Sequence, residues 1–193
     1  NIVIHTESYM KFEDKMSEIL SSIYEKKKRI SSSELLHEIG LQLDDQNSIL
    51  YQAAKNNIPI YCPGIADSSF GFQLYMFAQK HDDFIVDTIR DMERVTTDLS
   101  FDEKKGLISL GGSISKHYAI FAALLSGGFD YAVYMTTSRP QSGSLSGATT
   151  QEAKSWGKLK DDAEAATVNG DVCITFPLMM TKVLDDLEKE SLI

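Results

Sequence analysis

The sequence has few of the residues that build metal centres. It contains two cysteines and four histidines in 193 residues, and no C-x-x-C or H-E-x-x-H pattern brings them together. A G-x-S-x-G motif, which marks the nucleophile elbow of many serine hydrolases, is also absent. We therefore expect neither a bound metal nor serine hydrolysis.

Long apolar runs and an excess of positive charge are missing as well. The longest apolar candidate, Ala119–Met135, is interrupted by Ser126, Gly127, Gly128 and Asp130, so no run of about 18 apolar residues exists and we expect no membrane span. The formal net charge of -9 argues against general affinity for nucleic acid and suits basic partners or polycationic ligands.

Composition and the N-terminal sequence favour a cytoplasmic globular protein. With 42% hydrophobic and 24% charged residues, the chain can bury one sizeable core, and we expect a single domain over residues 1–193. The basic-then-apolar pattern of a secretory signal is lacking, and Cys62 and Cys173 have apolar neighbours. We therefore expect a reducing environment and two buried thiols.

The first third of the sequence predicts helices. Apolar residues recur at helical spacing in Tyr9, Phe12, Met16, Leu20 and Ile23. Residues 31–34 (Ser-Ser-Ser-Glu) form a capping box that predicts the start of a second helix. The basic run 26–29 complements the dipole at the end of the first helix, which we favour over a nucleic-acid patch.

Short apolar runs rich in β-formers follow, separated by amphipathic stretches such as 84–99. They are Ile58–Cys62, Leu107–Leu110, Tyr131–Met135 and Val172–Phe176. This alternation predicts an α/β fold with a Rossmann-like parallel sheet and helices on both faces. Ligands of such sheets gather at the carboxyl ends of the strands.

Small or polar residues follow the expected strands. These segments are 63–67, 111–113 and 136–138, whereas Asp171 precedes its strand and Pro177 is expected to open a helix. From Thr136 to Thr150, ten of fifteen residues are Ser, Thr or Gly. A loop of that length in a compact domain is more often functional than a mere connection.

Two short motifs have both an ordinary and a chemical interpretation. Gly111-Gly112 after a strand can bring the backbone close to an anion, but a glycine pair is as often only a turn. His117 is close to this pair in the sequence, but a single histidine is more often a core or capping residue than a functional one. Lys158 stands two residues after Trp156, the only tryptophan. Burial against an aromatic wall favours the neutral, nucleophilic amine, although most lysines are simply solvated.

Several of these segments together resemble the deoxyhypusine synthase family. They are residues 110–112, 116–117, 130–134, 144–148 and 152–158, with further similarity at 9–14, 58–69 and 171–178. The match is ordered and closely spaced, and it covers nearly all of this chain. Family members are longer, and the resemblance is to their C-terminal part, with the family's N-terminal region absent.

The resemblance implies a reaction and roles for individual residues. The family oxidises spermidine with NAD, carries the aminobutyl group on a lysine as an imine, and transfers it to a lysine of the hypusine-containing translation factor. Lys158, Trp156 and His117 match the catalytic positions. The implied cofactor-binding positions are Asp67, Gly112, Thr137, Ser138, Asp171 and Val172. The implied spermidine-binding positions are Glu152, His117, Gly143, Ser144 and Trp156.

The sequence departs from the family chiefly at the spermidine site. Three positions where the family has carboxylates are Ser142, Leu145 and Phe72, and the third glycine of the family's triplet is Ser113. A buried ammonium without a charge partner costs several kcal/mol. The three losses therefore indicate weakened spermidine binding.

Three hypotheses stay open. In the first, the chain is a catalytically impaired, regulatory paralogue that pairs in a tetramer with a complete deoxyhypusine synthase and activates it. In the second, it is an active NAD-dependent aminobutyltransferase that uses spermidine or another amine through Lys158. In the third, it is an NAD-binding scaffold without a catalytic role. Amine turnover by the isolated chain separates the second from the others.

Overall fold

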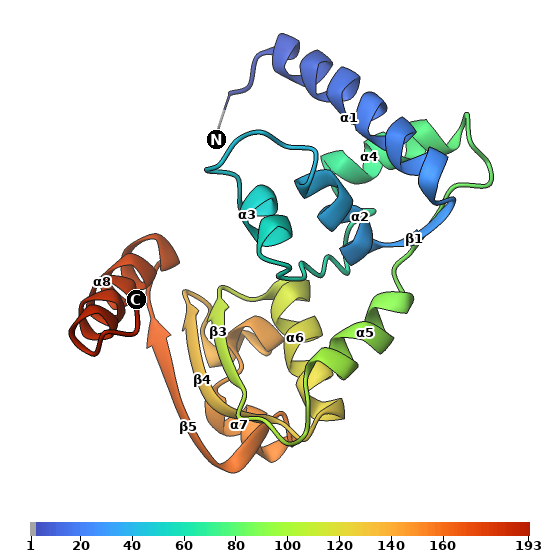
Figure 1. Ribbon diagram of the computed structural model, residues 1–193. Helices are drawn as coiled ribbons and strands as arrows, with labels where there is room; N and C mark the ends of the chain where they lie inside the picture. The colour runs from blue at the N-terminus through green and yellow to red at the C-terminus, as the bar shows by residue number, and fades with distance from the viewer. Residues whose placement is uncertain (1–2) are drawn as a thin grey trace. The chain divides into compact units, whose positions relative to one another are not determined.

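The computed structural model describes residues 3–193, which divide into two compact units. The first unit extends to Arg94 and the second from Val95 to Ile193 (Figure 1). Each contains a parallel sheet accompanied by helices, so the predicted α/β class is confirmed. The single domain expected over residues 1–193 stays a prediction. The presence of two compact units does not show whether either unit could fold without the other.

The first unit is mainly helical around a two-stranded sheet in which β1 and β2 run parallel. Its elements are α1 (Thr6–Lys26), β1 (Arg29–Ser31), α2 (Ser32–Gly40), α3 (Ile49–Lys55), α4 (Ser69–Ala78) and β2 (Ile85–Asp87). Helix α5 (Arg90–Asp98) begins in this unit and ends in the second. The predicted first helix is confirmed: it buries Met16, Leu20 and Ile23.

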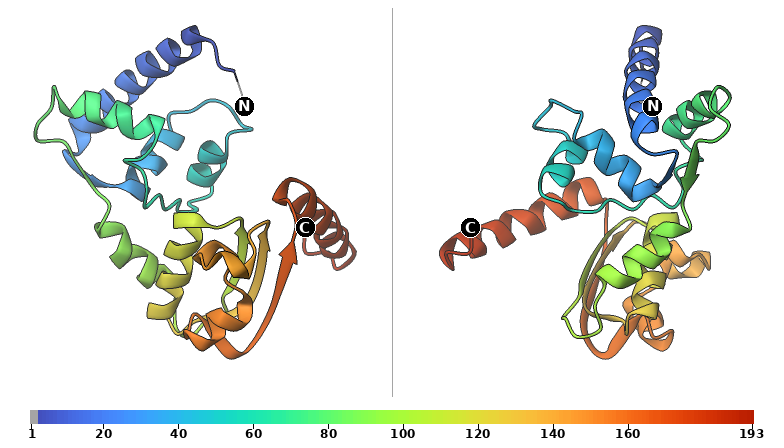
Figure 2. Two further views of the ribbon diagram at one scale, coloured as in Figure 1. Left: turned by 180° about the vertical axis from the view of Figure 1, so that it is seen from behind. Right: turned by 45° about the vertical axis from the view of Figure 1, so that its right-hand side comes forward.

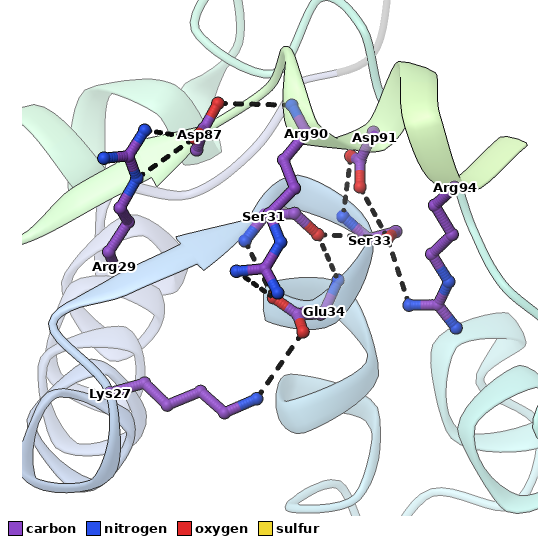
Figure 3. Close-up of polar contacts among 9 residues, drawn as sticks. All are labelled: Lys27, Arg29, Ser31, Ser33, Glu34, Asp87, Arg90, Asp91 and Arg94. Atoms are coloured by element: carbon purple, nitrogen blue, oxygen red, sulfur yellow. Dashed lines mark hydrogen bonds and ion pairs between the residues drawn. The ribbon is translucent and has the colours of Figure 1, made fainter.

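The predicted capping box begins α2. Ser31 Oγ accepts a hydrogen bond from the Glu34 backbone N–H at 3.2 Å, and the Glu34 carboxylate accepts one from the Ser31 N–H at 3.1 Å. Lys27 and Arg90 also lie 3.6 and 3.9 Å from Glu34 (Figure 3). Burial would raise the pKa of Glu34, but the Ser31 amide and these two cations outweigh it and lower that pKa.

A buried carboxylate joins α2 to α5. Asp91 is 2% exposed and accepts hydrogen bonds from the Ser33 N–H at 2.9 Å and from Ser33 Oγ at 2.6 Å (Figure 3). It also accepts one from Ser32 Oγ. Three donors compensate for the cost of burying the charge. Asp91 therefore fixes α5 against the first turn of α2.

The second unit is a three-stranded parallel sheet in the order β3-β4-β5. Its elements are β3 (Gly106–Leu110), α6 (Ser113–Leu125), β4 (Phe129–Thr136), the 3-10 turns η1 (Pro140–Ser142) and η2 (Leu145–Gly147), α7 (Thr150–Ser155), β5 (Leu159–Asn169) and α8 (Val172–Lys189). Leu107 pairs with Ala132, and Met135 pairs with Val168. Because all strands are parallel, their carboxyl ends meet at one edge.

Helices α6 and α7 cover one face of this sheet (Figure 2). Their buried residues Ile120, Ala123 and Ala153 form one cluster with Tyr134 of β4 and Leu159 of β5. Helix α8 contacts β4 through a hydrogen bond from Thr175 Oγ1 to Met135 Sδ and otherwise extends away, with none of its residues buried (Figure 2). The covered face therefore contains the core of this unit.

Two of the four expected strands are wrong. Residues 58–62 connect α3 and α4 and are neither helix nor strand, because Pro59 cannot donate to a strand ladder. Residues 172–176 form the first turns of α8, since Asp171 Oδ1 accepts a hydrogen bond from the Cys173 N–H at 2.8 Å and caps the helix. Pro177 consequently lies inside α8 rather than at its start.

The expectation of two buried thiols is also wrong. Cys173 is exposed because it lies on the first turn of α8, which buries nothing, and Cys62 is only half-buried. Burial nonetheless raises the pKa of the Cys62 thiol. Within residues 3–193, no helix combines the length and the apolar character that crossing a membrane requires.

Candidate functional site

Three loops meet at the carboxyl ends of the strands in the second unit. Residues 111–113 follow β3, residues 136–138 follow β4 and residues 170–172 follow β5, and together with Ser146 they line a pocket of about 250 Å³. The structure thus brings together five residues that the family resemblance assigns to the cofactor, namely Gly112, Thr137, Ser138, Asp171 and Val172. We call this pocket the cradle.

Backbone geometry shapes the cradle. Gly111 has a φ of +82° and open space where a Cβ would be, and Ser113 has a φ of +63°, which is unusual for a residue with a side chain. A Cβ on Gly112 would lie 2.5 Å from the Cβ of Ser146, so only glycine fits there. The Ser113 N–H donates to Ser146 Oγ at 2.9 Å, which ties the loop after β4 to the start of α6.

The cradle fits the phosphate and ribose of a dinucleotide. Gly112 is the N-cap of α6 and provides no side-chain cap, so the positive end of this 13-residue helix lies at the pocket. Asp171 caps α8 with one carboxylate oxygen and is exposed, so its other oxygen can accept from a ribose hydroxyl. The volume suits part of a dinucleotide rather than the whole molecule.

Asp67 is the one predicted cofactor residue outside the second unit. It lies in the exposed turn before α4 of the first unit, where its N–H donates to the Gly64 carbonyl at 3.0 Å. Its role in the cofactor site stays a prediction.

A wide hollow of about 620 Å³ lies beside the cradle. Its lining residues are Ser113, Ile114, His117, Leu145, Trp156 and Lys158. Ser113 therefore borders both the hollow and the cradle. The three residues that resemble the family's catalytic positions all face this one space, which we call the amine hollow.

Lys158 lies against an aromatic wall, as its sequence neighbourhood indicates. Its Nζ is 4.5 Å from the centre of the Trp156 ring. Gly157, with a φ of +69°, turns the chain after α7, and the Lys158 N–H donates to the Ala153 carbonyl at 3.0 Å. Burial lowers the pKa of the Lys158 amine, which increases the fraction present as a nucleophile.

Three residues predicted to bind spermidine do not line the amine hollow. The Glu152 carboxylate accepts from the Thr149 N–H at 2.7 Å in a capping box that begins α7. Gly143 and Ser144 lie on an exposed turn, where Ser142 and Ser144 share a hydroxyl hydrogen bond of 3.1 Å. Their predicted contact with an amine stays untested in this unit taken alone.

Sequence reasoning missed Lys116. This residue is 3% exposed, its Nζ donates to the Ala148 carbonyl at 3.0 Å, and it lies 4.0 Å from the centre of the Tyr134 ring. A usable signal existed, because Lys116 continues the buried stripe of Ile120 and Ala123 at helical spacing.

The fold and the two pockets define an α/β protein with a pocket at the carboxyl ends of its parallel strands and a lysine-bearing hollow beside it. A sequence profile of the family described as deoxyhypusine synthase matches residues 1–183. The chain therefore belongs to the deoxyhypusine synthase family.

Individual relatives agree with this assignment. The deoxyhypusine synthase of Senecio vernalis is 34% identical over 197 residues, which cover 99% of this chain and 53% of that protein. A relative from Methanopyrus kandleri, described as "Probable deoxyhypusine synthase", is 46% identical over 185 residues, which cover 95% of this chain and 60% of the relative. A crystal structure assigned to a deoxyhypusine synthase from Entamoeba histolytica has a TM-score of 0.70 at 25% identity and covers 93% of this chain and 55% of that one. The chain thus spans 53% to 60% of the length of these three proteins.

Proposed function

We propose that this chain is a subunit of a deoxyhypusine synthase in which its own amine site is impaired, and that it supports a complete partner subunit of the same family. In this proposal NAD binds in the cradle, the hollow has lost most of its affinity for spermidine, and Lys158 keeps the position from which an imine would form. The complex acts on a lysine of the hypusine-containing translation factor.

The observation that carries the proposal is the shared wall between the two pockets. Ser113 borders both, so a ligand in the cradle and an amine in the hollow would be neighbours. NAD, when bound, would supply the acceptor for the hydride that leaves the amine carbon. Gly112 and the first turn of α6 would hold its phosphates, and Asp171 a ribose hydroxyl.

Lys158 is suited to the transfer step. Its neutral amine would attack the C=N carbon of oxidised spermidine, and the C–N bond to diaminopropane would break, with a proton passing to the departing amine. The aminobutyl group is then held on Lys158 Nζ as an imine. The Trp156 wall favours this chemistry because it limits hydration of the ammonium form.

The composition of the amine hollow supports impairment. The residue at its rim, where the family has a carboxylate, is Leu145, and among the lining residues of this unit no side chain is acidic. The nearby Glu152 is occupied as the cap of α7. Spermidine would enter without the charge partners that usually offset the desolvation of its ammonium groups.

A mixing assay tests the proposal. The purified chain would be assayed for NAD-dependent spermidine cleavage and aminobutyl transfer, alone and with the complete paralogue from the same organism. We expect no activity alone and a large rate increase on mixing. Activity of the chain alone that is lost in Lys158→Ala would refute impairment.

A second function, turnover of a less charged amine, is favoured by the apolar Leu145 and Ile114 in the hollow. Assays of the isolated chain with monoamines and diamines would detect it. Binding of NAD without activity in any mixture would leave only a scaffold role.

A further inference from the structure

One short turn contributes a residue to each pocket. Leu145 lines the amine hollow, and the next residue, Ser146, lines the cradle. Both belong to η2, and the Ala148 N–H donates to the Leu145 carbonyl at 3.1 Å, which closes the turn. We call residues 145–148 the shared turn. A displacement of this turn would change the shape of both pockets at once.

The start of α6 and the end of β4 hold the middle of the shared turn. Ser146 Oγ accepts a hydrogen bond from the Ser113 N–H at 2.9 Å, and the Ser146 carbonyl accepts one from Thr136 Oγ1 at 3.4 Å. The backbones also approach closely, because a Cβ on Gly147 would lie 2.4 Å from the Arg139 carbonyl oxygen. Ser146 and Gly147 therefore have little room to move.

A buried lysine holds the end of the shared turn. Lys116 is 3% exposed, and its Nζ donates to the Ala148 carbonyl at 3.0 Å. The same Nζ lies 4.0 Å from the centre of the Tyr134 ring, which is fully buried. Helix α6 thus contacts the shared turn at its first residue and again three residues later.

Packing alone does not explain a lysine at position 116, because burial of an ammonium group is costly. A methionine of similar length would fill the same space without a charge. What the ammonium adds is a charge-assisted hydrogen bond to one backbone carbonyl, which is roughly twice as strong as a neutral hydrogen bond. That carbonyl belongs to Ala148, so the extra stabilisation acts on the shared turn.

We propose that Lys116 is a positioning residue that holds the shared turn through the Ala148 carbonyl, so that one turn sets the shape of both pockets. This inference rests on the proposed function, in which the cradle holds NAD. It requires no direct contact between Lys116 and a ligand. It predicts that loss of the Lys116 amine loosens the shared turn more than it loosens the sheet.

Amide hydrogen exchange, measured by nuclear magnetic resonance on the purified chain, tests the effect on the turn. The Ser113 and Ala148 N–H groups donate to Ser146 Oγ and to the Leu145 carbonyl, so their exchange rates report on the shared turn. The amides of β4, which pair in the sheet ladder, are the reference. Faster exchange in the turn alone marks local loosening, whereas faster exchange everywhere marks a loss of global stability.

Variants at two buried lysines separate the hydrogen bond from packing. Lys116→Met removes the donor and the charge, and Lys116→Arg retains both. Lys105→Met is the matched control, because Lys105 is 7% exposed and donates to the Ser100 and Ser126 carbonyls, outside the shared turn. Lys116→Gln, which has a shorter and neutral donor, replaces the methionine variant if that one does not fold, as judged by circular dichroism.

We expect the Ser113 and Ala148 amides to exchange about tenfold faster in Lys116→Met, and about threefold faster in Lys116→Gln, while exchange in β4 changes less than about twofold. Exchange in Lys116→Arg and Lys105→Met should match the wild type. An unchanged turn in Lys116→Met, an equal increase in β4, or an equal increase in Lys116→Arg or Lys105→Met would overturn the inference.

Fluorescence tests whether the turn links the two pockets. Trp156 is the only tryptophan, and it lines the amine hollow together with Leu145. ADP-ribose, which lacks the nicotinamide, is the probe for the cradle, and isothermal titration measures its binding separately. We expect saturating ADP-ribose to shift the Trp156 emission in the wild type and in Lys116→Arg, and the shift to be lost in Lys116→Met.

The two kinds of failure are distinguishable. ADP-ribose that binds the wild type without a shift in Trp156 emission would overturn the link between the pockets. ADP-ribose that does not bind the wild type would instead contradict the proposed NAD site, and the exchange rates would still decide whether Lys116 holds the shared turn.

Discussion

Restoring one carboxylate to the amine hollow should restore part of its affinity for polyamines. Leu145 is half-buried at the rim of a hollow that also contains Lys158, and no acidic side chain of this unit lines that hollow. In Leu145→Asp, the new carboxylate can pair with one ammonium of spermidine. Because the hollow is open to water and Lys158 competes for the same carboxylate, we take the weak end of ion-pair energies, about 1 kcal/mol, or about a fivefold lower Kd.

Isothermal titration of spermidine into the purified chain would measure this change. Leu145→Asn is the matched control, since it removes the same apolar contacts and adds a polar group without charge. The gain of the aspartate variant should shrink between about 0.05 M and about 0.5 M salt, because screening weakens an exposed pair. Equal affinities for the aspartate and asparagine variants would refute the reasoning that charge loss at Leu145 weakens the site.

Three further changes test the folding arguments by urea or thermal unfolding. Asp91→Ala removes the acceptor of the hydrogen bonds from Ser32 and Ser33 and should lower the free energy of unfolding by about 3 kcal/mol or more. A decrease of less than about 1 kcal/mol would contradict the view that Asp91 fixes α5 against α2. Ser113→Gly relieves a φ of +63° and should raise stability by about 0.5–1 kcal/mol, whereas a loss would argue against strain. The pKa of Glu34 is lowered in the fold below the 4.5 of the unfolded chain, so its contribution is present above that value and is lost as the pH falls through the folded pKa. The stability difference between wild type and Glu34→Gln should therefore shrink on acidification, and a constant difference would contradict the assignment.

The sequence predicted an element correctly where the structure that its own residues favour is also the structure that packing in the fold favours. The capping box at Ser31 is satisfied within four residues and needs no partner from elsewhere. The runs that became β3 and β4 are apolar and follow turn residues, so burial in a parallel sheet reinforces their β-propensity. These two strands also bring Gly112, Thr137 and Ser138 to one end of the sheet, and the cofactor role that the family resemblance implies for them stays a prediction.

The predicted strands were wrong where a single residue prevents an apolar, β-prone segment from forming a strand. Asp171 turns the β-prone run 172–176 into a helix by capping it, and Pro59 prevents pairing of the run 58–62. Strand β5 was missed because Lys160 and three acidic residues dilute its apolar pattern, and only Leu159 and Ala163 are buried. Its pairing with β4, a tertiary contact, decides its structure.

At the site, the sequence could identify residue types but not their partners. Glu152 was predicted to bind an amine, although the pattern Thr149-x-x-Glu152 is itself a capping box and the structure uses it as one. The burial of Lys116 follows the helical stripe of Ile120 and Ala123, but its contact with the Tyr134 ring, which is distant in the sequence, could not be predicted.

The two pockets differ in the kind of atoms that line them, and this difference explains how one could decay while the other persists. The cradle is bordered by backbone amides at Gly112 and Ser113, and a change from glycine to serine at position 113 keeps its N–H, which still donates to Ser146. Charge recognition in the amine hollow depends instead on individual side chains, so one substitution such as Leu145 removes one charge partner outright. Substitutions of equal number should therefore damage polyamine binding far more than dinucleotide binding. Under the proposed function, we expect a chain that retains the cradle and lacks these carboxylates wherever a partner subunit supplies the amine chemistry.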